Sequence, residues 1–146
     1  MAETPGGSVK DHAEEEPDTG TGHFCFVDGA RYDGEWINNG GKKMRHGQGK
    51  FVDGPESYEG HWAHDSMHGQ GKMCFASGAV YEGEFVKNQF YGQGSYTWSD
   101  GAVYTGGWRE NKMHGEGTYK DSENVQWKGQ FYNGKFNNGR SYVMLR

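Results

Sequence analysis

Apolar and polar residues alternate with a period of two along most of the chain after Gly20, and the alternation comes in copies. The clearest copy covers residues 81–94 and reads Tyr-Glu-Gly-Glu-Phe, four linking residues, and then Phe-Tyr-Gly-Gln-Gly. Successive side chains of a strand point to opposite faces of a sheet. The pattern therefore predicts two strands per copy, with rings and glycines on one face and mostly polar side chains on the other.

The copies recur at a nearly constant spacing. Their leading aromatic residues are 26, 23, 23 and 23 positions apart, namely Tyr32, Tyr58, Tyr81, Tyr104 and Trp127. A Gly-x-Gly element follows in each of the first four copies, beginning at Gly47, Gly69, Gly92 and Gly115. Self-similarity at such a period is typical of a solenoid-like array, in which each unit buries its apolar face on its neighbours.

Turn residues separate the predicted strands. Dipeptides that end in Gly link one copy to the next, because Gly tolerates the positive φ of a tight turn; they are Asp28-Gly29, Asp53-Gly54, Ser77-Gly78 and Asp100-Gly101. Asn-rich links join the two strands within a copy. The first of these links, residues 37–43, is longer than the others, and we expect it to be a surface insertion.

Glycine on the apolar face calls for a physical reason, since Gly in a strand interior normally weakens the strand. We expect each of these glycines to leave room for a ring of a neighbouring unit, which then lies on bare backbone. About eleven strands at roughly 4.8 Å each would form an all-β ribbon. This ribbon is predicted to be elongated, one sheet thick, antiparallel and strongly twisted.

The charge divides the chain into two parts. The formal net charge is −5. It belongs to residues 1–18, which contain six acidic side chains and one lysine. This segment has no large apolar side chain, so residues 1–18 are predicted to be a disordered acidic tail, either a plain solvated terminus or a short partner-binding segment. Residues 19–146 are predicted to be the repeat domain, with a partial leading repeat at 20–29 and repeats beginning near 30, 56, 79, 102 and 125.

The composition fits an aromatic core in a cytoplasmic protein. Nine Tyr, eight Phe and five Trp supply the apolar area in a chain with a single Leu and a single Ile. No apolar run is long enough to span a bilayer and no secretory signal is present. Cys25 and Cys74 hold equivalent positions two units apart, roughly 19 Å from each other, so we expect free thiols rather than a disulfide.

Catalytic and metal-binding chemistry finds little support. His46, His68 and His114 share one slot of the repeat, but neighbouring units hold them about 10 Å apart, too far to share a zinc ion. Four glutamates lie on the polar face with no pocket implied, which favours solvated side chains over acid–base catalysis; they are Glu35, Glu59, Glu82 and Glu84. The Gly-x-Gly elements do not open helices, so they are no phosphate cradle. We expect no enzyme activity, no metal and no cofactor.

Two surfaces are candidates for binding. The only basic concentration, Lys42, Lys43, Arg45 and His46, could dock an anionic phospholipid headgroup. A single-layer sheet also leaves part of its ring-bearing side uncovered, and an exposed aromatic strip usually marks an interaction site. The predicted protein-binding groove consists of Tyr32, Trp36, Tyr58, Trp62, Tyr81, Phe85, Tyr104 and Trp108. No broad basic face accompanies these rings, so nucleic-acid binding is not expected, and the free strand edges would allow a homodimer.

The Tyr-x-Gly-x-Trp element, the His-Gly-x-Gly element and the period of 23 residues together resemble the MORN (membrane occupation and recognition nexus) repeat. The resemblance covers about residues 20–145, and the segment 77–135 most resembles short vertebrate members of that family. It implies stacked β-hairpins in a grooved single-layer sheet, acting as a non-catalytic scaffold or adaptor that binds a peptide or helix. It further implies vesicle- or phagosome-related, sperm or ciliary assemblies, hence association with vesicles, the acrosome or the axoneme. The alternative that stays open is a peripheral membrane module acting through the basic cluster.

Overall fold

The computed structural model describes residues 18–146, so the predicted tail lies outside the described residues except for its last position. The described part of the chain forms one antiparallel sheet in which every strand pairs with its neighbours in sequence order. Its strands are β1 Thr19–Cys25, β2 Arg31–Asn39, β3 Lys42–Asp53, β4 Glu56–Ala63, β5 Ser66–Cys74, β6 Val80–Val86, β7 Gln89–Thr97, β8 Val103–Arg109, β9 Lys112–Lys120, β10 Gln126–Tyr132, β11 Lys135–Asn137 and β12 Tyr142–Val143.

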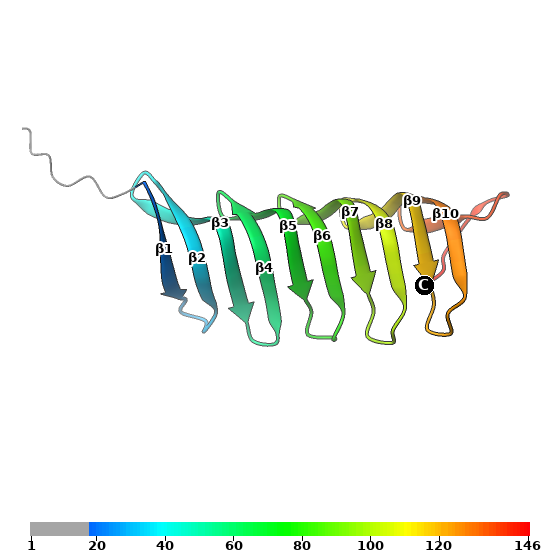
Figure 1. Cartoon of the computed structure of the whole chain (residues 1–146), viewed down its shortest axis with the longest axis horizontal. Coiled ribbons are helices and arrows are strands. Elements are labelled where there is room, and N and C mark those ends of the chain that lie inside the picture. Colours follow the sequence, from blue (N-terminus) through cyan, green and yellow to red (C-terminus); the bar gives the residue numbers. More distant parts are fainter. Residues whose placement is uncertain (1–17) are drawn as a thin grey trace, which may run out of the picture.

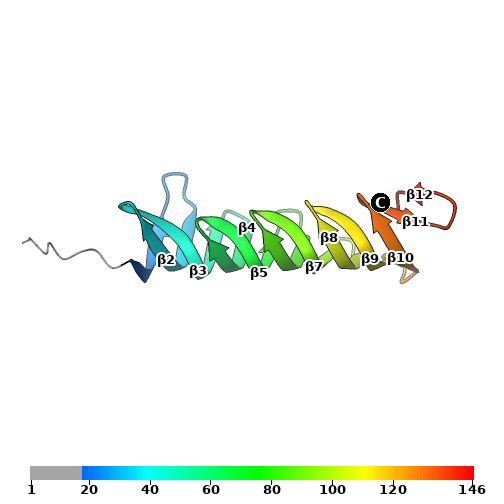
Figure 2. The ribbon, with the colours of Figure 1, turned by 90° about the horizontal axis from the view of Figure 1, so that it is seen from above.

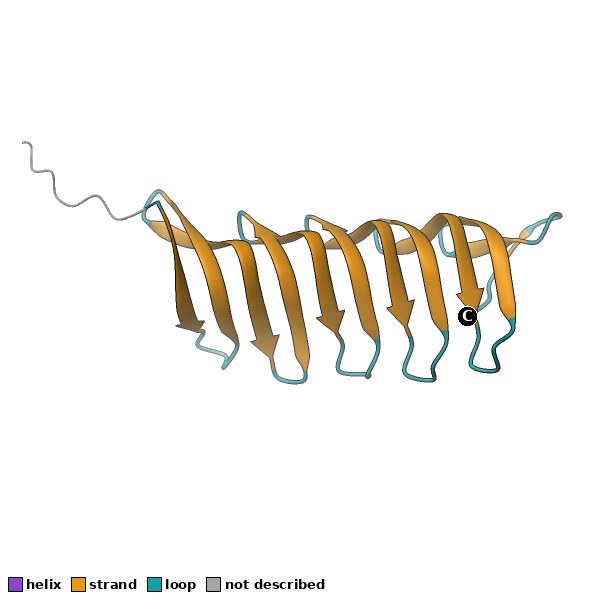
Figure 3. Cartoon of the chain, in the orientation of Figure 1, coloured by secondary structure: helices purple, strands orange, loops and turns teal. Residues whose placement is uncertain are grey.

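The strands follow one another along the long axis of an elongated ribbon (Figure 1), and loops alternate between its two long edges (Figure 3). Seen from above, the hairpins form a single row (Figure 2). The all-β, single-layer antiparallel array predicted from the sequence is thus confirmed. Among residues 18–146, no helix has the length and apolar character needed to cross a bilayer.

Two kinds of turn alternate along the ribbon. The loops that carry Asp-Gly or Ser-Gly place Gly29, Gly78 and Gly101 at φ values of 93°, 94° and 92°, as predicted for tight turns. The links within hairpins are two-residue turns, for example Lys87 (φ 45°) and Asn88 (φ 68°). Two successive residues with positive φ match the right-handed twist of paired strands, which is why Asn is favoured there.

The long link of the first hairpin is not a loop insertion. Residues 37–39 pair with residues 42–44, so the extra residues extend strands β2 and β3 and only Gly40 and Gly41 form the turn. At this end β3 pairs with β4 only as far as Gly47, so residues 42–44 pair with β2 alone. The predicted surface insertion is therefore present, with residues 39–43 exposed, and it takes the form of a strand extension.

A β-bulge breaks the register of each of the first four hairpins just after the Gly of Tyr-x-Gly. In the third hairpin the shift falls between Gly83 and Phe85, so the extra residues lie on β7, where residues 91–93 stand opposite Glu84 and bend the strand. The Tyr81 hydroxyl donates a hydrogen bond to the Glu84 carbonyl at 2.7 Å, and the Glu84 carboxylate accepts one from Gln93 N at 2.5 Å. The equivalent tyrosine bonds recur in the other three hairpins with Tyr32, Tyr58 and Tyr104 as donors. The tyrosine hydroxyl therefore satisfies a carbonyl that the bulge removes from the ladder.

Glycine makes room for the tyrosine ring, but the ring belongs to the same hairpin. A Cβ added at Gly94 would meet first the Tyr81 hydroxyl and then Cζ at 2.6 Å. Gly49, Gly71 and Gly117 lie in the same way under Tyr32, Tyr58 and Tyr104. The expectation that a neighbouring unit supplies the ring is wrong for these four positions, because the tyrosine folds across its own strand pair.

The neighbouring unit contributes a second set of ring contacts instead. Trp62 Nε1 donates to the Gly49 carbonyl of the preceding hairpin at 3.2 Å, and Trp108 Nε1 donates to the Gly94 carbonyl at 3.1 Å. Rings also meet edge to face across hairpins, as Tyr81 does with Trp108 at a centroid distance of 5.4 Å. Such pairs stabilise by about 0.5–1.5 kcal/mol beyond their burial, so each hairpin depends on the next.

Hydrogen bonds from the turn residues join successive hairpins at one edge of the ribbon. Asn88 N donates to the Met67 carbonyl at 3.0 Å, and the Asn88 side-chain oxygen accepts from Met67 N at 2.8 Å. Asn111 repeats both bonds with Phe90. A turn residue thus continues the sheet ladder onto the preceding unit.

Candidate binding groove

Three hollows follow one another on the ring-bearing side of the ribbon. Their volumes are about 380, 180 and 650 Å³ from the N-terminal to the C-terminal end. Arg45, Phe51 and Asp65 line both the first and the second, while Met67, Met73 and Asn88 line both the second and the third. Because adjoining hollows share walls, they form one groove along the array.

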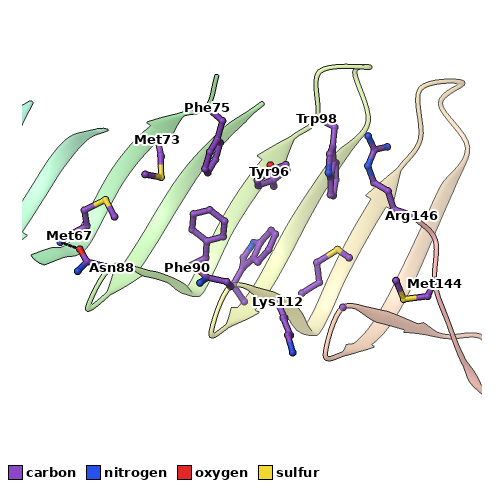
Figure 4. Close-up of a pocket in the computed structure, with 14 residues that line it drawn as sticks. Met67, Met73, Phe75, Asn88, Phe90, Tyr96, Trp98, Lys112, Met144 and Arg146 are labelled. Atoms are coloured by element: carbon purple, nitrogen blue, oxygen red, sulfur yellow. Dashed lines mark hydrogen bonds between the residues drawn. The ribbon is translucent and has the colours of Figure 1, made fainter. Parts of the chain in front are cut away.

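The largest hollow is lined mainly by methionine and aromatic side chains. Phe75, Tyr96 and Trp98 project into it from one side, and Met67 and Phe90 from the other (Figure 4). The remaining lining residues are Met73, Asn88, Trp108, Asn111, Lys112, Met113, Gly134, Met144 and Arg146. Methionine is flexible and polarisable, so such a surface adapts to apolar side chains of different shapes.

The eight rings predicted to form the groove are buried, although five of them reach the floor of one of its hollows. Each of them is at most 8% exposed. A ring of the next hairpin packs edge to face on each of the four tyrosines. Tyr32 and Trp36 line the first hollow, Tyr58 and Trp62 the second, and Trp108 the third. Tyr81, Phe85 and Tyr104 belong to the buried core cluster.

The half-buried walls of the groove come from positions that the sequence reasoning did not assign to it. One wall consists of the residues two positions before each Gly-x-Gly element, such as Met67, Phe90 and Met113. The other includes residues two and four positions after it, such as Tyr96 and Trp98. The apolar residue that recurs just before the Gly-x-Gly elements was the signal that could have found the first wall.

The predicted basic cluster lies on strand β3, and the structure brings three of its four residues to one hollow. Lys42 and Lys43 are exposed at the end of the long hairpin. Lys42, Lys43 and Arg45 line the first hollow, whereas His46 lines none of the three. The Lys43 ammonium lies 4.5 Å from the Trp36 ring centroid, and His46 Nδ1 accepts a hydrogen bond from His64 N at 3.1 Å.

Arg45 is held inside the groove. Its guanidinium carbon lies 4.3 Å from the Trp62 ring centroid and 5.0 Å from that of Phe51. Its Nε donates to Asp65 Oδ1 at 2.7 Å. The charge of Arg45 is therefore already paired and stacked on rings.

The opposite face of the sheet is polar. Lys50 and Glu59 form an exposed ion pair at 3.9 Å, and such pairs contribute little to stability. On β1 and β2, His23 Nδ1 is bonded to Asp33 Oδ1 while Cys25 Sγ lies 3.6 Å from His23 Nε2. This order of thiol, imidazole and carboxylate was not foreseen from the sequence, and none of these three side chains lines a described hollow.

The histidines predicted to share a repeat slot play different roles. His46 accepts the hydrogen bond from His64, whereas His114 Nδ1 is buried without a hydrogen-bond partner. No group of three or more His, Cys, Asp or Glu side chains within residues 18–146 is placed to hold a metal ion. Cys25 and Cys74 are free thiols, the former exposed.

Burial shifts the ionisation of the core tyrosines. Removal from water raises the pKa of Tyr32 and of Tyr58 to about 12. It raises the pKa of Tyr81 and Tyr104 in the same direction, aided by nearby glutamate charges. These hydroxyls stay protonated and act as fixed donors to the bulge carbonyls rather than as acid–base groups.

Comparison with known proteins assigns the repeats. The family model of the MORN repeat matches residues 42–54, 58–80, 81–103 and 104–124, which is more than half of the 146 residues. The comparison with curated proteins gave no match.

Proposed function

The chain belongs to the MORN-repeat family, and from that membership and the shape of the groove we propose that it is a non-catalytic scaffold that binds a segment of a partner protein. MORN repeats are in general modules that bind proteins or membranes. The observation that supports a protein ligand is the hollow of about 650 Å³ with its methionine and aromatic walls. A ligand pocket of this size and apolar character buries a side-chain cluster well.

The ligand proposed for this groove is a peptide or helix that presents apolar side chains at regular spacing. Amphipathic helices bind apolar grooves through such anchors, and methionine walls allow more than one partner to fit. The groove runs across several hairpins, so a segment lying along it would contact several repeats at once. This multiplicity is what a scaffold requires.

The proposed setting of the scaffold rests on the resemblance to the family alone. We place it in the cytoplasm, in vesicle- or phagosome-related, sperm or ciliary assemblies. Strand β1 pairs with β2 alone among the described residues, which leaves an edge of seven residues that a second copy could extend. A homodimer through that edge is part of the proposal.

Photo-crosslinking tests the groove directly. A photoreactive amino acid at Met113, in the groove wall, is compared with one at Gln93, which is exposed on the polar face. The proposal expects a crosslinked partner segment from position 113 and none from position 93, and mass spectrometry then identifies the segment.

The synthetic segment is next titrated against purified variants by calorimetry. Met67→Glu with Met113→Glu puts two charges into the groove and should weaken binding at least tenfold, on the order of 1.4 kcal/mol. Gln70→Glu with Gln93→Glu adds the same charge to the outer face and should leave binding unchanged. Equal affinity of the two double variants would overturn the proposed function.

A membrane module is the second candidate, and one observation favours it. Lys42 and Lys43 are exposed at the tip of a hairpin that is longer than its neighbours. Flotation with vesicles that contain phosphatidylserine tests this candidate with Lys42→Gln and Lys43→Gln. Salt-sensitive binding that these changes abolish would support it, and binding that survives them would exclude this cluster as the site.

A further inference from the structure

The last residues of the chain turn back into the groove. After β11 the chain reverses through a turn closed by the bond from Asn138 N to the Ser141 carbonyl, 3.0 Å long. Strand β12 follows, and Leu145 packs against the core cluster. Arg146 then lies beside Trp98 at the end of the largest hollow (Figure 4).

Arg146 occupies a site made by the array. Its guanidinium carbon lies 4.5 Å from the Trp98 ring centroid. Nη1 donates to Asp100 Oδ2 at 3.0 Å and lies 3.4 Å from the Tyr119 hydroxyl oxygen. A planar cation that can stack on a ring while its N–H groups reach a carboxylate is the property that distinguishes arginine from lysine.

The carboxylate and the ring are held in place by contacts of their own. Asp100 Oδ1 accepts a hydrogen bond from Ala102 N at 3.0 Å, which fixes the carboxylate in the turn between β7 and β8. Trp98 packs edge to face on Tyr119 at a centroid distance of 5.6 Å. None of these contacts needs Arg146, so the site is formed by the turn and the sheet.

A second arginine shows the same chemistry in the groove. Arg45 stacks on Trp62 and is bonded to Asp65 in the first two hairpins, whereas Asp100 lies in the turn between the third and the fourth. The two arginines come from unrelated parts of the sequence, yet each lies on a ring beside an aspartate. The ring-bearing side of this array is thus suited to guanidinium groups.

The segment that carries Arg146 is weakly attached. Strand β12 has two residues, and only Phe136↔Val143 and Asn137↔Tyr142 pair it with β11. Tyr142 and Met144 are 48% and 66% exposed. Few contacts and an exposed backbone mean that such a segment opens locally at a lower free-energy cost than the array unfolds.

We propose that Trp98, Asp100 and Tyr119 form an arginine-binding site, which Arg146 fills in cis and an arginine of the partner segment fills in trans. The inference rests on the proposed function and deepens it, because it defines the partner. The partner segment combines apolar side chains for the large hollow with an arginine at one end, and it displaces residues 144–146 when it binds. The chain's own segment therefore weakens the apparent affinity, since the site is free only while that segment is detached.

The test uses the chain's own segment as the probe. A synthetic peptide Tyr-Val-Met-Leu-Arg, blocked at both ends, is titrated into the full chain carrying Leu145→Ser and Arg146→Gln, and the Trp98 indole N–H signal is followed by NMR. The expected result is saturable movement of that signal. The same peptide with Gln in place of its Arg should bind at least tenfold more weakly, and the wild-type chain should bind the Arg peptide more weakly than the variant does.

A conservative change in the site separates charge from structure. Asp100→Asn keeps an oxygen for the bond from Ala102 N but removes the charge, so the Arg peptide should lose its advantage over the Gln peptide while the variant keeps its thermal stability. Equal binding of the two peptides, no movement of the Trp98 signal, or equal binding by wild type and variant would overturn the inference. The proposed function is judged separately: a partner segment that is sensitive to Met67→Glu with Met113→Glu but indifferent to Asp100→Asn would keep the groove and discard the arginine site.

Discussion

Replacing Gly94 by alanine tests whether glycine is present to accommodate the ring of Tyr81. The new Cβ would lie 2.6 Å from Tyr81 Cζ and still closer to the hydroxyl oxygen, so the ring would have to move. It has little room, because Tyr81 is fully buried, stacks on Phe90 at a centroid distance of 3.9 Å, and meets Trp108 at 5.4 Å.

The size of the effect follows from three contributions. Overpacking costs about 1–3 kcal/mol, and loss of the hydroxyl bond to the Glu84 carbonyl costs about 0.5–1.5 kcal/mol more. Alanine in a strand interior regains about 0.5–1 kcal/mol relative to glycine. The expected net change for Gly94→Ala is a destabilisation of about 0.5–4 kcal/mol.

A double-mutant cycle isolates the contact. Tyr81→Leu removes the atoms that the new Cβ would meet, so in that background Gly94→Ala should be neutral or slightly stabilising. Free energies of unfolding come from urea titrations followed by Trp fluorescence. Gly29→Ala is the control: its Cβ meets nothing within 4 Å and only its φ of 93° is unfavourable, so its cost should be equal in both backgrounds. If Gly94→Ala cost the same with and without the Tyr81 ring, the explanation of the glycine would be refuted.

Three further predictions follow from the structure. Burial raises the pKa of Tyr32 and Tyr58 to about 12, above the unfolded value of about 10. The contribution of each protonated tyrosine to the free energy of unfolding is therefore complete below pH 10 and falls from pH 10 to 12 by about 1.4 kcal/mol per pH unit. Tyr32→Phe with Tyr58→Phe should reduce this dependence of the free energy of unfolding on pH, and an unchanged dependence would contradict the assignment. Asn88→Ala should destabilise the protein by about 1–2 kcal/mol, because it removes the hydrogen bond from Met67 N and places alanine at positive φ. Asn88→Gly tolerates the positive φ of the turn and should destabilise the protein less in the same urea assay. Cys25, exposed beside His23, should react with a neutral aromatic disulfide faster than Cys74, which holds the equivalent repeat position but is half-buried. The two rates are measured in the two single Cys→Ser variants, and equal rates would contradict this prediction.

Repetition made the fold predictable. The alternation around Tyr81 and Phe85 and its period of 23 residues define strands, faces and array without any knowledge of contacts. The strand on which the Tyr81 ring lies could not be derived from the sequence, because the bulge in β7 opposite Glu84 changes the register locally and has no distinct signal in a single sequence. The ring therefore lies on its own hairpin and not on the next.

The candidate site was less predictable than the fold. Rings that are regular in sequence, such as Tyr81, turned out to be the buried layer, since each hairpin covers the one before it. The exposed walls come from less regular positions, among them Met67 and Met113. Arg146 itself lies beyond the last regular repeat, where no period constrains the chain, and only the structure brings it to Asp100.

The most direct measurement of the central claim is a pair of NMR spectra of the protein labelled with ¹⁵N and with ¹³C at the methionine methyl groups, recorded with and without the partner segment that crosslinking identifies. Met67, Met73 and Met113 line the groove and report on its occupancy. The account predicts that their methyl signals shift on saturation while the backbone amides of Gln70 and Gln93, on the outer face, stay in place. Shifts confined to those outer amides, with the three methyl signals unmoved, would contradict it.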